Sequence, residues 1–124
     1  MGATTFHARQ KGKNARHAFE LAQEEAYWMH GHGGYSGTIA EKQGYKEYTR
    51  PTGMHETTAL KLLDELVDYS YDVDKQLTTL AKKYPKVPTH TLKDMIKVFD
   101  DKWGPAVCME IKPHIYQFCG WASC

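Results

Sequence analysis

A cluster of glycines limits what this chain can fold into, because four of its ten glycines lie within the seven residues 31–37. Glycine loses much backbone entropy in a helix or strand, but it readily adopts turns with positive φ. The cluster therefore predicts a loop. This loop separates a short N-terminal part of the chain from a longer C-terminal part.

The N-terminal part has two patterns. Residues 3–9 alternate between β-forming and polar positions, which predicts a half-buried strand. Asn14 then stands where a helix N-cap is expected, and small apolar residues recur at three- and four-residue spacing from Ala15 to Met29. These alanines predict an amphipathic helix that sits close against a sheet.

The region after the loop predicts two short strands, over residues 38–42 and 45–49, and then a helix. The helical stripe begins at Thr57, and two readings of its end stay open. It either stops near Tyr71, where Asp72 and Asp74 weaken it, or runs on to Tyr84, before Pro85.

The C-terminal part predicts one more helix and a hairpin. Thr91 and Asp94 resemble a capping box, and apolar residues at helical spacing follow up to Trp103, before a Gly-Pro stop. Residues 107–112 alternate, and a Pro-His turn leads into residues 115–118, so these segments predict a β-hairpin.

Together these patterns predict one α+β domain over residues 1–124. The chain has 124 residues and a mass of 14.2 kDa, and no repeat or linker divides it. We expect a small, mostly antiparallel sheet formed by the N-terminal strand, the middle strands and the C-terminal hairpin. Two to three helices are expected to pack on one face of it.

Charge and cysteine content exclude several classes of function. Sixteen Lys and Arg nearly balance fifteen Asp and Glu, so the N-terminal cations give little support to nucleic-acid binding. No apolar run is long enough to span a membrane, and no secretory pattern opens the chain. Three cysteines without a Cys-x-x-Cys pair indicate a reduced, cytoplasmic protein.

The glycine-rich loop is the candidate ligand site, because it offers backbone N–H donors, two hydroxyls, an aromatic ring and a nearby cation. Neither the P-loop nor the dinucleotide pattern occurs in it. A purely structural alternative is a tight glycine corner that permits helix–strand packing. The predicted ligand-binding residues are Gly31, Gly33, Gly34, Tyr35, Ser36, Gly37, Thr38 and Lys42.

Catalysis, if present, would depend on Glu41 as general acid or base, assisted by His30 or His32. The competing interpretation is an exposed strand glutamate paired with Lys42 or Lys46. The two histidines also suggest a metal site completed by His7, His55 or Cys108, but no second pair has ligand spacing. We therefore expect no metal and no cofactor.

Several sequence blocks resemble one family. They are GATTF at residues 2–6, GHGGYSGTIAEK at 31–42, KWGPA at 102–106 and FCGWAS at 118–123. The chain is similar in these blocks to a family of small bacteriophage and bacterial proteins. The resemblance implies a viral accessory protein that works in the host bacterial cytoplasm during infection. Such proteins commonly counter host defence, either by binding or degrading nucleotide signals or by blocking a host protein.

Two hypotheses follow. In the first, the loop binds a phosphate-bearing, nucleotide-type ligand, a host defence signal that the protein sequesters or cleaves; whether it is an enzyme stays open. In the second, the protein is a non-enzymatic inhibitor that contacts a host defence protein through the charged, Tyr-rich segment 43–50. A homo-oligomer also stays open, because the stripe from Leu60 onward could form a dimer face.

Overall fold

The computed structural model describes residues 2–31, 34–67 and 72–124. Its elements follow the order β1 (Ala3–Lys11), α1 (Ala15–His30), η1 (Ile39–Glu41), β2 (Tyr45–Tyr48), α2 (Glu56–Asp64), α3 (Val73–Lys83), α4 (Thr89–Asp100), β3 (Ala106–Lys112) and β4 (Ile115–Ser123). Four strands form one sheet in the order β1-β4-β3-β2. The predicted α+β class is confirmed, with one helix more than expected.

The sheet is antiparallel except at one edge. β1 pairs with β4 along its whole length, and β4 pairs with β3 through the predicted hairpin. β2 pairs with β3 in parallel, because the chain crosses over through α2, α3 and α4 between these two strands. The first and last strands of the chain are thus neighbours, as the sequence predicts.

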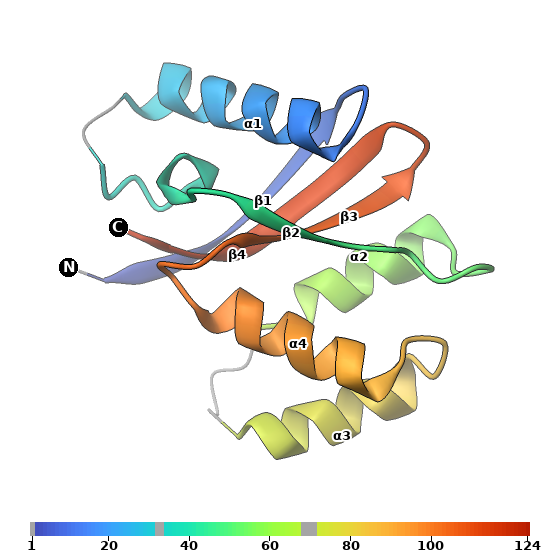
Figure 1. Ribbon diagram of the computed structural model, residues 1–124. Helices are drawn as coiled ribbons and strands as arrows, with labels where there is room; N and C mark the ends of the chain where they lie inside the picture. Colours follow the sequence, from blue (N-terminus) through green and yellow to red (C-terminus); the bar gives the residue numbers. More distant parts are fainter. Residues whose placement is uncertain (1, 32–33, 68–71) are drawn as a thin grey trace.

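Helices cover both faces of the sheet, which corrects the prediction of one covered face. Figure 1 shows α1 on one side and α2, α3 and α4 on the other. Three of the residues that β3 and β4 turn toward α1 are small, namely Ala106, Cys108 and Ala122, so their burial is hard to recognise in the sequence. Phe19, Tyr45 and Phe118 close this layer, with ring centroids 5.1 to 5.9 Å apart.

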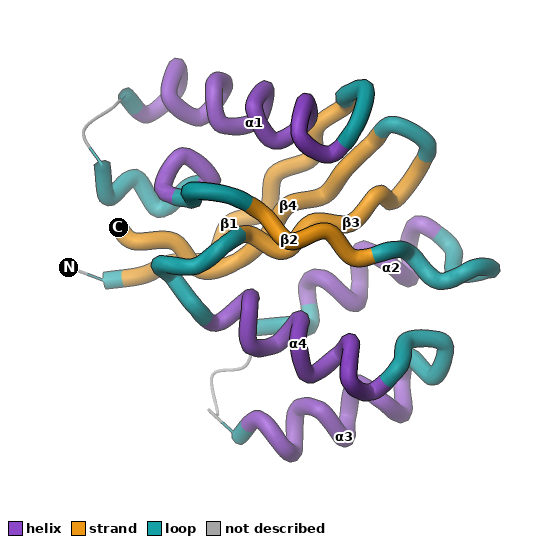
Figure 2. The backbone as a smooth tube through the Cα atoms, viewed as in Figure 1, coloured by secondary structure: helices purple, strands orange, loops and turns teal. Residues whose placement is uncertain are grey.

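The second layer has the larger apolar cluster. Leu62, Leu63, Leu92, Ile96 and Phe99 are fully buried between the three helices and the sheet. The tube in Figure 2 shows α2 and α3 as separate helices on this face, so the long helical stripe consists of two helices. Tyr71, where the first helix was predicted to stop, lies outside the described residues.

Three local predictions are decided by side-chain hydrogen bonds or their absence. Asn14 caps α1 by accepting the N–H of His17 at 2.8 Å, as predicted. The strand predicted over residues 38–42 is wrong, because Thr38 caps a 3₁₀ turn there by accepting the N–H of Ala40. The capping box is also wrong: α4 begins after Pro88, without a side-chain cap.

Candidate functional site

The glycine-rich loop connects α1 to η1 at the end of the molecule where both chain termini lie (Figure 1). Gly31 ends α1 with a φ of 78°, and its N–H bonds the carbonyl of Tyr27 at 2.7 Å. His30 is the last helical residue and is exposed. His32 and Gly33 lie outside the described residues, so the structure gives no position for these two predicted site residues.

The carboxylate of Glu41 occupies the centre of the loop. One oxygen accepts the N–H of Tyr35 at 2.9 Å, and the other accepts the N–H of Ser36 at 3.1 Å. The hydroxyl of Ser36 donates to the second oxygen at 2.6 Å. Backbone φ angles of 78° at Gly34 and 56° at Tyr35 help turn these N–H groups inward. The loop thus forms an anion nest, and its anion belongs to the chain itself.

These hydrogen bonds set the ionisation of Glu41. Burial raises the pKa of its carboxyl, but the bonds from Ser36 and Tyr35 outweigh this effect, so the pKa lies below its ordinary value. A carboxylate with a lowered pKa is a weaker base. Glu41 is therefore better suited to holding the loop than to moving a proton.

The two hydroxyls predicted to hold a ligand also bond within the loop. Ser36 Oγ lies 2.7 Å from Thr38 Oγ1, besides its bond to Glu41. Thr38 Oγ1 in turn accepts the N–H of Ala40. The structure brings Ser36, Thr38 and Glu41 together as the sequence predicts, but as partners of one another.

Lys42 points to a different part of the fold. Its side chain is buried, with 2% of the residue exposed, and Nζ donates to the carbonyls of Asp101 and Lys102 at 3.0 and 3.4 Å. Burial lowers the pKa of Lys42 to about 8, although nearby Asp101 acts to raise it. The ammonium group thus binds the carbonyls where α4 ends, a position that favours a cation.

The loop is fixed to its surroundings on both sides. The N–H of Gly37 donates to the carbonyl of Ser123 at 2.8 Å, next to the end of β1. On the other side, Gln23 bonds the carbonyls of Ile39 and Lys42, and the Tyr27 hydroxyl bonds the carbonyl of Ala40. The resulting loop is held by the terminal strand, by α1 and by its own carboxylate.

Aromatic rings project outward from this fixed framework. Tyr35 is 51% exposed, and Trp103, in the turn between α4 and β3, is 63% exposed. Glu41 and Lys42 connect them, because Glu41 holds Tyr35 while Lys42 holds the turn that carries Trp103. Lys102 Nζ lies 5.1 Å from the centre of the Trp103 ring. The sequence prediction placed Trp103 at the end of a helix and missed the bonds from Lys42 to the turn that carries it.

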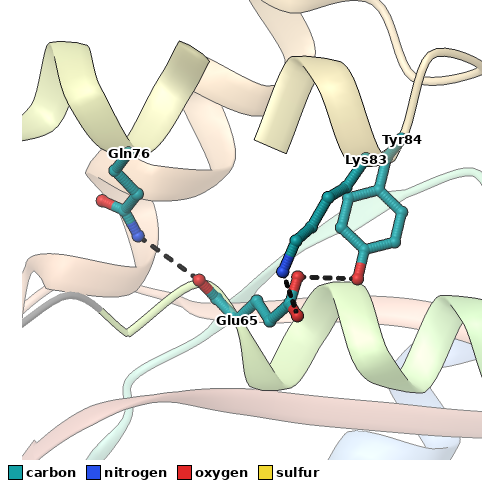
Figure 3. A network of polar contacts seen from close by, with 4 residues as sticks. All are labelled: Glu65, Gln76, Lys83 and Tyr84. Atoms are coloured by element: carbon teal, nitrogen blue, oxygen red, sulfur yellow. Dashed lines mark hydrogen bonds and ion pairs between the residues drawn. The ribbon is translucent and has the colours of Figure 1, made fainter. Parts of the chain in front are cut away.

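A second polar cluster lies between α2 and α3 (Figure 3). Glu65 accepts Lys83 Nζ at 3.0 Å and the Tyr84 hydroxyl at 2.7 Å. Gln76, which is buried, donates to the carbonyl of Leu66 at 2.6 Å. The Tyr84 hydroxyl and the Glu65 carboxylate are hydrogen-bonded to each other, so this cluster attaches α3 to the end of α2. No sequence motif marks it.

The remaining candidates are dispersed. Within residues 2–31, 34–67 and 72–124, no group of three or more His, Cys, Asp or Glu could hold a metal ion. His7 lies 3.5 Å from Asp64, His55 caps α2, and Cys108 is buried with a raised thiol pKa caused mainly by burial. In the segment 43–50, Lys46 bonds Asp94 of α4.

Comparisons with known proteins give no match: no family model, no curated protein and no solved structure matches the chain. The resemblance to small phage proteins therefore stays a prediction. Among the helices that the structure describes, none is long and apolar enough to cross a membrane.

Proposed function

We propose that this chain is a non-catalytic protein that binds another protein through its loop end. We define the loop end as Tyr35, Lys102 and Trp103. Following the resemblance, the partner would be a host defence protein in the bacterial cytoplasm.

One observation carries the proposal: the polar groups of the loop turn inward, whereas its aromatic rings turn outward. A loop that binds phosphate directs its N–H groups at the ligand, but here the N–H groups of Tyr35 and Ser36 bond Glu41. Rigidly held aromatic side chains are typical anchors of protein interfaces, because they bury much area at little entropic cost. Tyr35 and Trp103 have exposed rings, and the backbone N–H of each donates to a carboxylate of the chain.

The experiment compares variants of the immobilised full chain in extract from bacterial cells. We expect the wild type to retain one protein in stoichiometric amount, and both Trp103→Ala and Tyr35→Ala to lose it. The control is His90→Ala, which removes an exposed ring at the start of α4, away from the loop. Circular dichroism checks that each variant is folded. The proposal is wrong if all variants retain the same proteins, or if the wild type retains none.

A second candidate keeps the loop as a site for a phosphate-bearing nucleotide. It is favoured by the nest itself, because N–H groups that bind a carboxylate can also bind phosphate oxygens. In this case the phosphate displaces the carboxylate of Glu41, and Tyr35 stacks on the base.

Titration calorimetry with ADP-ribose as the probe separates the two candidates. If phosphate enters the nest, Glu41→Ala removes the internal competitor and should tighten binding about tenfold. No binding of ADP-ribose by either protein, together with a partner lost in Trp103→Ala, would leave protein binding as the function.

A further inference from the structure

β1 is an edge strand of the sheet, and no described strand lies beyond it. Gly2 and Cys124 exchange both backbone hydrogen bonds, and Gly12 donates to the carbonyl of His114. The even-numbered residues of β1 therefore bond β4, and the backbone groups of Thr5, His7 and Arg9 point away from the sheet. These outward groups have no partner among the described residues. A long free edge of this kind is a template for another strand.

The flank of α1 above this edge carries two exposed apolar side chains. Trp28 is 90% exposed and Met29 is 69% exposed. Trp28 and Leu21 line a groove together with Glu24 and Glu25 of α1 and Gln10 of β1. Met29 lines a neighbouring cavity of about 280 Å³ over residues 6–10 of the same strand. Helical spacing places Leu21 and Trp28 on one side of α1. The free strand edge and the exposed tryptophan therefore belong to one surface.

We propose that this surface binds a second copy of the chain, so that the protein is a two-fold symmetric dimer with a continuous eight-stranded sheet. A single added peptide strand would cover the edge of β1 but would leave Trp28 exposed above it. A second copy related by a two-fold axis covers both, because it brings its own β1 and its own α1 to the same place.

The dimensions fit this arrangement. α1 contacts both β1 and β4, so its axis lies roughly above the space between these strands. A second β1 would lie about 4.8 Å from the first. The two copies of α1 would then run side by side at on the order of 10 Å, which is a normal packing distance for helices. Leu21 and Trp28 would lie between them.

One register of the two strands gives every residue of β1 a partner. With His7 on the two-fold axis, all nine residues of β1 find a partner. Arg9 then lies opposite Thr5 of the other copy, and Lys11 lies opposite Ala3. Neither cation faces another cation, and like charges directly opposite each other destabilise a strand pair.

The mass in solution tests the dimer. For the full chain at about 100 µM, sedimentation equilibrium should give twice the mass of 14.2 kDa. Trp28→Glu, at an exposed position, should give the monomer mass with unchanged circular dichroism. His7→Pro removes an outward N–H, which a free edge strand tolerates but an inter-copy ladder does not, so it should also give the monomer. The control His90→Glu should remain dimeric.

Hydrogen exchange locates the interface independently of any variant. The amides of Thr5, His7 and Arg9 should exchange at least tenfold more slowly in concentrated samples than in dilute ones. A wild type that is monomeric at this concentration would overturn the proposal. So would a dimer that both Trp28→Glu and His7→Pro leave intact, since it would form through another surface.

Discussion

The hydroxyl of Ser36 donates to the carboxylate of Glu41 at 2.6 Å and lies 2.7 Å from the hydroxyl of Thr38. This contact joins the glycine-rich loop to the 3₁₀ turn that follows it. It also fills the anion nest with a group of the chain itself.

Removing the Ser36 hydroxyl should weaken the loop. Ser36→Ala leaves Glu41 with two backbone donors, so we expect the free energy of unfolding to fall by about 1.5–3 kcal/mol, as for a hydrogen bond to a charged group. The pKa of Glu41 should rise. Denaturant unfolding measures the first effect and carboxyl NMR titration the second. Thr78→Ala, which removes an exposed neutral hydrogen bond in α3, is the control and should cost less.

The lowered pKa of Glu41 also predicts acid sensitivity. A carboxyl group whose pKa is lower in the folded state stabilises the fold above its unfolded pKa, and this stabilisation is lost as the pH falls through the folded value. The free energy of unfolding of Glu41→Gln should therefore depend less on pH below about 4.5 than that of the wild type. Equal slopes for the two proteins would contradict the role given to this carboxylate.

The lowered pKa of Lys42 predicts how the free energy of unfolding changes at alkaline pH. Its pKa of about 8 lies below the ordinary value of 10.5, so between these two values the unfolded chain binds more protons than the folded one. Stability then rises with pH across this range. We expect the wild type to gain stability relative to Lys42→Met from pH 8 to 10.5, measured by urea unfolding. Parallel curves for the two proteins would show that Lys42 is not responsible.

Local contacts account for most of what the sequence could predict. The Asn14 cap joins residues three apart, and the hairpin turn joins strands that follow one another in the chain. A short stretch of sequence is therefore enough to predict each of them. The proximity of Ser36 and Glu41 was predictable for the same reason. The direction of their hydrogen bonds was not, because a glycine-rich segment can turn its N–H groups to either side.

Contacts between distant residues account for most of what the sequence left undecided. Lys42 bonds a carbonyl 59 residues away, and no spacing rule connects the two positions. The coverage of both sheet faces was missed for a related reason, because small residues on the α1 face, such as Ala106, become apolar core only when a helix lies against them.

Two loop glycines with similar backbone angles should differ in their tolerance of a side chain. Gly31 and Gly37 have φ values of 78° and 71°. A Cβ on Gly31 would meet nothing within 4 Å, whereas a Cβ on Gly37 would lie 2.6 Å from Thr4 Cγ2. Gly31→Ala should cost about 1 kcal/mol for the strained backbone alone. Gly37→Ala should cost more, and equal thermal shifts would argue against the tight packing of the loop on β1.

The cluster in Figure 3 attaches α3 to α2 through the carboxylate of Glu65. Tyr84→Phe removes the hydroxyl that Glu65 accepts at 2.7 Å but keeps the buried ring. Because Glu65 keeps its bond to Lys83, we expect the unfolding free energy to fall by only about 1–2 kcal/mol. Burial raises the pKa of Glu65 and the bonds from Tyr84 and Lys83 lower it, so losing the Tyr84 bond should raise this pKa. Hydrogen exchange should show the loss in α3 first, since α3 depends on this attachment. Uniform loss across the whole sheet would mean that the cluster does not act locally.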